Sequence, residues 1–122
     1  MQPTISRIAL YVRGIPQIAA FYQKYFDLEI DDAGGDFTCL QSKEGGCALI
    51  LLQASKGHKI GQSCIKIVFD VPDVAAFKEQ SREAGLVFGA IHQADGYEYA
   101  NAHDPAKNPI QISDRRFKKT AP

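Results

Sequence analysis

The sequence lacks the features that mark several large classes of protein. Its 122 residues include no tryptophan and only one methionine. No apolar run approaches the roughly 18 residues of a membrane-spanning helix. The first residues, Met1-Gln2-Pro3-Thr4, lack the charged region and apolar stretch of a signal peptide. We therefore expect neither a membrane partner nor secretion.

Cysteine is also scarce. Cys39, Cys47 and Cys64 are odd in number, show no CxxC spacing and lie in apolar, strand-like segments. This pattern predicts reduced core cysteines in a cytoplasmic protein. A thiol nucleophile is the alternative, although no neighbouring residues indicate an activated thiol.

An excess of one charge is missing as well. Fourteen Lys and Arg residues balance fourteen Asp and Glu residues. A general nucleic-acid binder needs a basic surface, so we expect no nucleic-acid partner. The one-sided cluster of Arg115, Arg116, Lys118 and Lys119 is interpreted as a solvated C-terminal tail, with a binding patch as the alternative.

What the chain does contain is an internal repeat. Residues 7–12 (RIALYV) align with residues 66–71 (KIVFDV) at an offset of 59. The alignment continues through the apolar pairs Ile15/Val74 and Ile18/Phe77. After a two-residue insertion, residues 49–51 stand opposite residues 110–112. The sequence therefore indicates a duplicated module.

Each module reads as a strand, a helix and three further strands. In the first module (about 4–53), period-two and helical spacings predict these elements at 4–12, 16–26, 28–31, 37–42 and 47–53. In the second (about 63–114) they fall at 64–71, 73–84, 86–90, 97–102 and 109–113. Gly14 ends the first strand, Pro16 suits the first helical turn and Gly85 caps the second helix. A polar, glycine-rich linker spans residues 54–62, and the tail spans 115–122.

The predicted fold class is α+β, built from two tandem βαβββ modules. One helix can cover only one face of a four-stranded sheet, so the other face needs a second module or a second chain. Two curved, mixed sheets would surround a central cavity suited to a ligand. Exposed sheet edges and small size favour a homodimer.

Several segments carry a resemblance to a known family. Ile8-Ala9-Leu10-Tyr11-Val12, with Phe21-Tyr22 and Phe26-Asp27-Leu28, stands in the first module; Phe69-Asp70-Val71-Pro72-Asp73-Val74 stands in the second. His103-Asp104-Pro105-Ala106-Lys107-Asn108-Pro109-Ile110-Gln111-Ile112 is similar to the aspartate-proline turn and closing strand of that family. Over residues 4–114 the chain resembles the vicinal-oxygen-chelate superfamily, which holds glyoxalase I, the fosfomycin- and bleomycin-resistance proteins and the extradiol dioxygenases.

The resemblance implies a divalent metal held by residues of the first and last strand of each module. Those positions are occupied here by Arg7, Ile50, Lys66 and Gln111. The internal repeat also groups them, because it pairs Arg7 with Lys66 and Ile50 with Gln111. Arginine and protonated lysine have no lone pair to give, and fixed positive charges repel a cation. We therefore expect no metal at this site and no cofactor.

The same positions suggest a binding site for a small organic molecule. Arg7, Tyr11, Ile50, Lys66 and Gln111 are predicted to bind a polar or anionic ligand, with Arg7 able to make two contacts to a carboxylate. In the alternative, Arg7 and Lys66 pair with Asp70 and Glu98 and only fill space.

A second alternative is a replacement metal site made of His92, His103 and Glu98, since all three belong to one hairpin region. Ordinary surface histidines are the competing interpretation. The sequence identifies no catalytic residue.

Three functions remain open at this stage. The first is a metal-free binding protein of the bleomycin-resistance type. The second is an enzyme, a lyase or dioxygenase of the glyoxalase kind, with a rearranged metal site or none. The third is a non-catalytic interaction domain whose cavity is filled by its own side chains.

Overall fold

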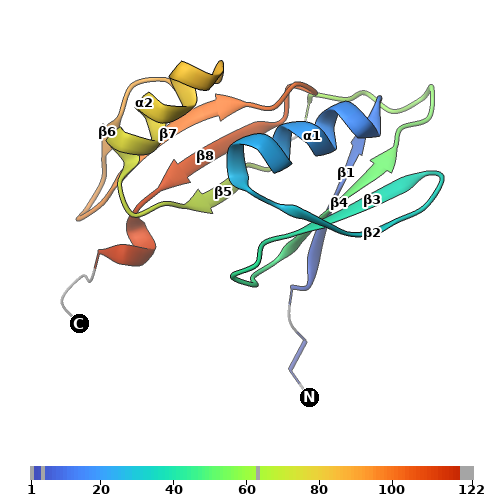
Figure 1. Cartoon of the computed structure of the whole chain (residues 1–122), viewed down its shortest axis with the longest axis horizontal. Helices are drawn as coiled ribbons and strands as arrows, with labels where there is room; N and C mark the ends of the chain where they lie inside the picture. The colour runs from blue at the N-terminus through green and yellow to red at the C-terminus, as the bar shows by residue number, and fades with distance from the viewer. Residues whose placement is uncertain (1, 4, 63, 119–122) are drawn as a thin grey trace. The chain divides into compact units, whose positions relative to one another are not determined.

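The structure is a computed structural model that describes residues 2, 3, 5–62 and 64–118. The chain divides into two compact units, residues 1–62 and 63–122. Each unit contains a four-stranded sheet with one α-helix against it (Figure 1). Neither helix in the described residues is long and apolar enough to span a membrane.

The first unit has the element order β-α-β-β-β. Its elements are β1 (Arg7–Val12), α1 (Ile15–Phe26), β2 (Glu29–Ala33), β3 (Phe37–Gln41) and β4 (Ala48–Gln53). The strand order in the sheet is β1-β4-β3-β2, with β1 parallel to β4 and the other pairs antiparallel. The parallel pair needs a long connection between its strands, and α1 lies in that connection.

Helix α1 covers one face of this sheet. Pro16 occupies its first turn, and Asp27 ends it in the left-handed conformation (φ 58°). The buried side of the helix, which includes Ile18 and Tyr22, packs over the sheet face that carries Leu10 and Leu51. The opposite sheet face carries the other alternate residues of β1, which are exposed.

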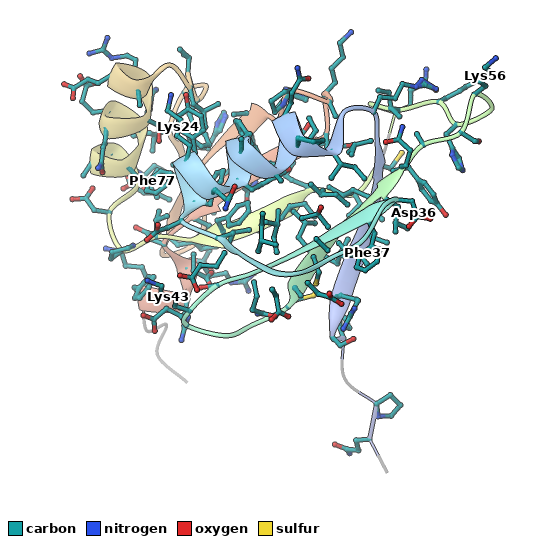
Figure 2. All side chains as sticks on the ribbon, turned by 45° about the vertical axis from the view of Figure 1, so that its right-hand side comes forward. Lys24, Asp36, Phe37, Lys43, Lys56 and Phe77 are labelled. Atoms are coloured by element: carbon teal, nitrogen blue, oxygen red, sulfur yellow. The ribbon has the colours of Figure 1, made fainter. Side chains whose placement is uncertain are left out.

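The turn between β2 and β3 places a glycine against an aromatic ring. A Cβ atom at Gly34 would lie 2.4 Å from Cε1 of Phe37, the first residue of β3, whose side chain is labelled in Figure 2. Any other residue at position 34 would have to displace this ring.

The second unit repeats the plan with a shorter third element. Its elements are β5 (Ile67–Asp70), α2 (Val74–Ala84), β6 (His92–Gln93), β7 (Glu98–His103), β8 (Pro109–Ser113) and the 3-10 turn η1 (Arg115–Phe117). The strand order is β5-β8-β7-β6, with β5 parallel to β8.

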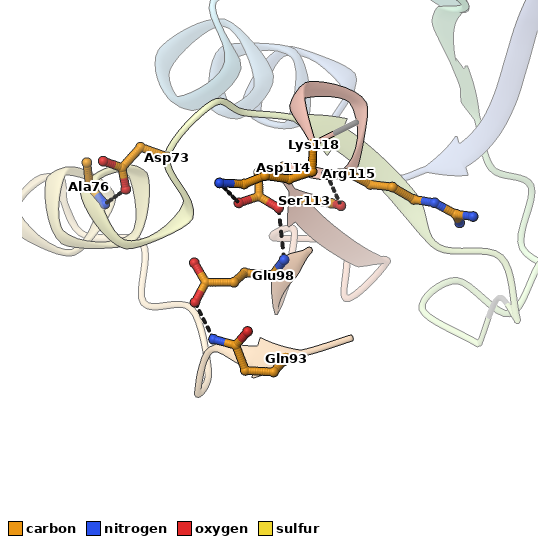
Figure 3. Close-up of polar contacts among 8 residues, drawn as sticks. All are labelled: Asp73, Ala76, Gln93, Glu98, Ser113, Asp114, Arg115 and Lys118. Atoms are coloured by element: carbon orange, nitrogen blue, oxygen red, sulfur yellow. Dashed lines mark hydrogen bonds and ion pairs between the residues drawn. The ribbon is translucent and has the colours of Figure 1, made fainter. Parts of the chain in front are cut away.

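Both ends of α2 are capped. The Asp73 side chain accepts a hydrogen bond from the Ala76 backbone N–H (3.0 Å), as Figure 3 shows. At the other end Gly85 is left-handed (φ 109°), and the N–H of Leu86 donates to the carbonyl of Ser81 (2.8 Å). The predicted cap at Gly85 is thus confirmed.

The predicted α+β class with two βαβββ modules is confirmed, but one predicted strand is wrong. Residues 86–90 form no strand; the third element is β6. Leu86 and Phe88 are buried and Val87 is exposed, so the alternation that suggests a strand is real. Among the hydrogen bonds of the described residues, this segment reaches β7 only from the N–H of Gly89 to the carbonyl of Asn101 (2.8 Å). Side-chain burial alone produced the alternation.

Several predicted boundaries also need correction. The strands predicted from residues 4 and 64 begin at Arg7 and Ile67, and residue 4 lies outside the described residues. β2 spans Glu29–Ala33 and so ends two residues beyond the strand predicted at 28–31. Cys39 is buried in β3 as predicted, but Cys47 and Cys64 are exposed and precede their strands, so the core interpretation is wrong for both.

Candidate functional site

The second unit presents a polar sheet face on the side away from α2. Ile110 and Ile112 are fully buried on the helix side, so Gln111 of β8, which lies between them, points the other way. The register places Gln111 between Val68 of β5 and Asn101 of β7 on this same face. Apolar side chains therefore build the core on one side of the sheet, while polar ones gather on the other.

A pocket of about 350 Å³ lies on this polar face, entirely within the second unit. It is lined by residues of β5, β8, η1 and the approach to β7: Val68, Asp70, Tyr97, Gln111, Ser113, Arg115 and Arg116. Cavities of this size are at the lower end of the range that holds small organic ligands.

The turn η1 is held beside the pocket by a buried carboxylate (Figure 3). Asp114 is only 2% exposed, and its Oδ1 accepts a hydrogen bond from the backbone N–H of Glu98 (2.8 Å). Its other oxygen lies 3.7 Å from Nζ of Lys118. The backbone N–H of Arg115 donates to Oγ of Ser113 (3.2 Å). These contacts fix the turn relative to the start of β7.

The turn supplies two guanidinium groups to the pocket. Arg115 lies over the ring of Tyr97, 5.2 Å from its centroid. Arg116 Nη1 is 3.9 Å from Oδ2 of Asp70, and both side chains are largely exposed, so solvent screens this pair strongly. Both arginines are exposed, as the prediction of a solvated tail requires. That prediction did not include their contacts with Tyr97 and Asp70. Lys119 lies outside the described residues.

Beside the pocket, three polar side chains form a hydrogen-bonded cluster. Nζ of Lys66 donates to Oδ1 of Asn101 (3.0 Å), and Nε2 of Gln111 donates to the same oxygen (2.9 Å). Two predicted site residues, Lys66 and Gln111, are thus connected through Asn101, which the sequence interpretation did not include. β7 and β8 form a hairpin centred on residue 106, so positions 101 and 111 stand opposite each other. The strand register could therefore have identified Asn101 as a neighbour of Gln111.

The alternative in which Lys66 pairs with Asp70 or Glu98 is wrong. Asp70 pairs with Arg116, and Glu98 accepts a hydrogen bond from Gln93. Lys66 instead donates its hydrogen bond to the amide oxygen of Asn101.

The other predicted site residues, Arg7, Tyr11 and Ile50, belong to the first unit. They lie on β1 and β4, on the sheet face away from α1, where Ile50 stands opposite Ala9 in the register. The ring of Tyr11 stacks on His58 with centroids 4.0 Å apart.

Arg13 holds the loop that carries His58 through two hydrogen bonds. The Arg13 guanidinium donates to the carbonyls of Ser55 (3.2 Å) and His58 (2.9 Å). The side chain of Tyr11 is therefore held at one end of this sheet face.

Comparison with known proteins identifies the fold. The family model described as Glyoxalase/Bleomycin resistance protein/Dioxygenase superfamily matches residues 4–112. The chain belongs to this superfamily. Comparison with curated proteins finds no match.

Solved structures of the same fold cover nearly the whole chain. Lactoylglutathione lyase from Agrobacterium tumefaciens is similar at 20% identity and a TM-score of 0.74, covering 95% of this chain and 96% of its own. TnmS3, an antibiotic binding protein from Streptomyces sp. CB03234, is similar at 16% identity and a TM-score of 0.77, covering 91% and 94%. A possible glyoxalase from Bacillus cereus is similar at 16% identity and a TM-score of 0.73, covering 91% and 98%. At these identities the likeness establishes the fold alone.

The metal that the superfamily resemblance implies does not fit the residues present. In the second unit, the two positions hold Lys66, whose ammonium donates to Asn101, and Gln111, whose amide nitrogen donates to the same oxygen. A divalent cation needs lone pairs directed at it, and an ammonium group offers none. In the first unit the equivalent positions hold Arg7 and Ile50, which provide no ligand atom. Among the four positions only the carbonyl oxygen of Gln111 could bind a metal, and one weak ligand does not hold a divalent cation.

The suggested replacement metal site is not formed either. Within the described residues, no group of three or more His, Cys, Asp or Glu side chains is placed to hold a metal ion. His92 instead stacks on Tyr99, with ring centroids 5.1 Å apart, and Glu98 bonds Gln93. His103 lies exposed at the end of β7.

Proposed function

We propose that this protein binds a small organic anion, without a resident metal, in the pocket of its second unit. The observation that carries the proposal is the convergence of Arg115 and Arg116 on a pocket that also contains Gln111. Two guanidinium charges face one carboxylate, Asp70, so the lining carries a net positive charge. An anion is the ligand that such a pocket favours.

The shape of the lining favours a planar ligand. Tyr97 presents an aromatic ring against which Arg115 already lies, and Val68 adds an apolar side chain that is 51% exposed. A flat ring can pack on both side chains while its acidic group bonds a guanidinium. An aromatic carboxylate combines these properties. The likeness of the fold to TnmS3, an antibiotic binding protein, supports binding as the function.

Arg7, Tyr11 and Ile50 stay proposed ligand-binding residues of the first unit. By the internal repeat they are the equivalents of Lys66, Asp70 and Gln111. Their place on the sheet face opposite α1 supports this assignment.

We further propose that the protein is cytoplasmic and works as a homodimer. The two exposed free cysteines, Cys47 and Cys64, support a reducing compartment, because exposed thiols become oxidised elsewhere.

Calorimetric titration with benzoate and with its uncharged counterpart benzamide tests the proposed function. We expect benzoate to bind and benzamide to bind at least about tenfold more weakly, since the amide loses the charge-assisted hydrogen bonds. Arg116→Met and Gln111→Leu should each weaken benzoate binding by about tenfold. Equal binding of the two compounds, or no benzoate binding, contradicts the proposal.

Arg82→Met is the matched control for loss of an arginine. Arg82 lies on α2, exposed, and pairs with Glu79, whose carboxyl pKa it lowers through their hydrogen bond. It does not line the pocket. This variant should bind benzoate like the unmodified protein.

A further inference from the structure

The Lys66–Asn101–Gln111 cluster has a defined hydrogen-bond polarity. An ammonium group has no lone pair, so the Asn101 side chain must present its oxygen, and not its NH₂ group, to Lys66. Gln111 must then direct its own NH₂ group at that oxygen, 2.9 Å away. The chemistry of Lys66 therefore sets the orientation of both amides, independently of how the two amide atoms are told apart.

This orientation leaves the cluster rich in unused donors. Lys66 has three N–H groups and uses one of them here; Gln111 uses one of two. No described residue accepts a hydrogen bond from the Asn101 NH₂ group. The Asn101 oxygen, by contrast, is already used twice. A positive charge surrounded by free N–H donors is complementary to an anion with several oxygens.

We propose that Lys66, Asn101 and Gln111 form an oxyanion-binding subsite at the position where the superfamily resemblance implies a metal. The subsite takes a carboxylate, sulfate or phosphate group. Lys66 supplies the charge, and the amide nitrogens supply directed hydrogen bonds. Asn101 positions the other two through its single shared oxygen.

The subsite adjoins the pocket because Gln111 belongs to both. Lys66 precedes β5 and Asp70 ends it, so at about 3.3 Å per residue their Cα atoms lie about 13 Å apart along the face. Asp70 is paired with Arg116. One cationic centre thus lies near each end of the face, and the matching ligand carries two anionic groups. This last step rests on the proposed function.

Sodium sulfate is the probe for the subsite alone. We expect a saturable shift of the Asn101 and Gln111 side-chain amide resonances in a ¹⁵N–¹H correlation spectrum at constant ionic strength. Lys66→Met should weaken sulfate binding at least about tenfold, and Lys66→Arg should largely retain it. Lys56→Met, an exposed lysine of the first unit labelled in Figure 2, is the control and should change nothing.

Asn101→Asp separates binding from a merely structural role. An aspartate at position 101 still accepts hydrogen bonds from both neighbours, so the fold is kept, but it loses the free NH₂ group and adds a negative charge. We expect no sulfate binding in this variant. Unsaturable shifts, or shifts that survive Lys66→Met or Asn101→Asp, overturn the subsite.

Terephthalate, which carries two carboxylates, tests whether the matching ligand has two anionic groups. This test is separate from the test of the proposed function. Terephthalate should bind at least about tenfold more tightly than benzoate, and Lys66→Met should remove that gain while leaving benzoate binding intact. If benzoate binds but terephthalate gains nothing, the two-anion inference fails and the proposed function stands. If Arg116→Met leaves benzoate binding unchanged while sulfate still shifts the Asn101 resonance, the proposed function fails and the subsite stands.

Discussion

Among single residues, Asp114 supports the candidate pocket without lining it. It lies between the last strand and the arginine-bearing turn, and it is almost fully buried. A buried carboxylate is stable only when its oxygens are satisfied, and here the N–H of Glu98 and the ammonium of Lys118 do this. Its position therefore connects protein stability to the placement of Arg115 and Arg116.

Replacing Asp114 should expose this connection. Asp114→Ala leaves the N–H of Glu98 buried without a partner, so we expect the free energy of unfolding to fall by about 2 kcal/mol. Asp114→Asn keeps an acceptor oxygen and should lose less than half as much. Urea denaturation followed by circular dichroism measures both. Equal losses would show that charge, and not the hydrogen bond, is what matters.

Some residues of the candidate site can be predicted from the sequence, and others cannot, for a physical reason. The family resemblance, supported by the internal repeat, singles out Lys66 and Gln111, and the structure joins them through Asn101. Asn101 was missed because an amide on a strand has no distinctive pattern until its partners are known. Arg115 and Arg116 were missed as pocket residues, since a terminal basic cluster looks the same whether or not a buried aspartate anchors it.

Among the secondary-structure elements, α2 has the more clearly defined ends. Its C-terminal glycine adopts φ 109°, a conformation in which a Cβ atom is strained. The following segment then enters the core at Leu86.

Gly85→Ala should therefore lower the free energy of unfolding by about 1–2 kcal/mol. Gly89→Ala is the matched control, because a Cβ there would meet only ordinary contact, 3.6 Å from the Asn101 carbonyl oxygen. It should change stability by less than about 0.5 kcal/mol. Thermal unfolding of both variants makes the comparison. Similar melting temperatures for the two would argue against strain at position 85.

The segment 86–90 shows where sequence periodicity stops being informative. Alternating burial of Leu86 and Phe88 is what a strand would show. A strand also needs a continuous ladder of backbone hydrogen bonds, and residue identities do not encode whether the neighbouring strand extends far enough to supply one. Here pairing with β7 begins only at His92.

At the scale of the whole molecule, the two units show how a duplicated fold diverges. In both, the segment leaving the last strand returns to the end of the first strand. In the first unit the contact is a ring stack of His58 on Tyr11; in the second it is the ion pair of Arg116 with Asp70. Tyr11 and Asp70 are equivalent in the repeat. The βαβββ plan could be predicted because both units keep the same spacing of apolar residues. The contact at the end of the first strand could not be predicted, because its chemistry differs between the units.

Each unit also leaves two strands at the edges of its sheet. These are β1 and β2 in the first unit and β5 and β6 in the second. Edge strands present backbone N–H and C=O groups that can pair with another chain. We expect light scattering coupled to size-exclusion chromatography to give twice the 13.4 kDa mass of the chain. A single-chain mass at all concentrations contradicts the homodimer.

The anchored turn has a practical consequence for anyone who purifies this protein. An affinity tag fused shortly after this turn would follow closely on Phe117, the last residue of the turn that bears the pocket arginines. A polyhistidine tail placed there would bring its own imidazoles, and any nickel they carry, near the candidate pocket. A tag that is cleaved off before the titrations keeps the ligand measurements free of that artefact.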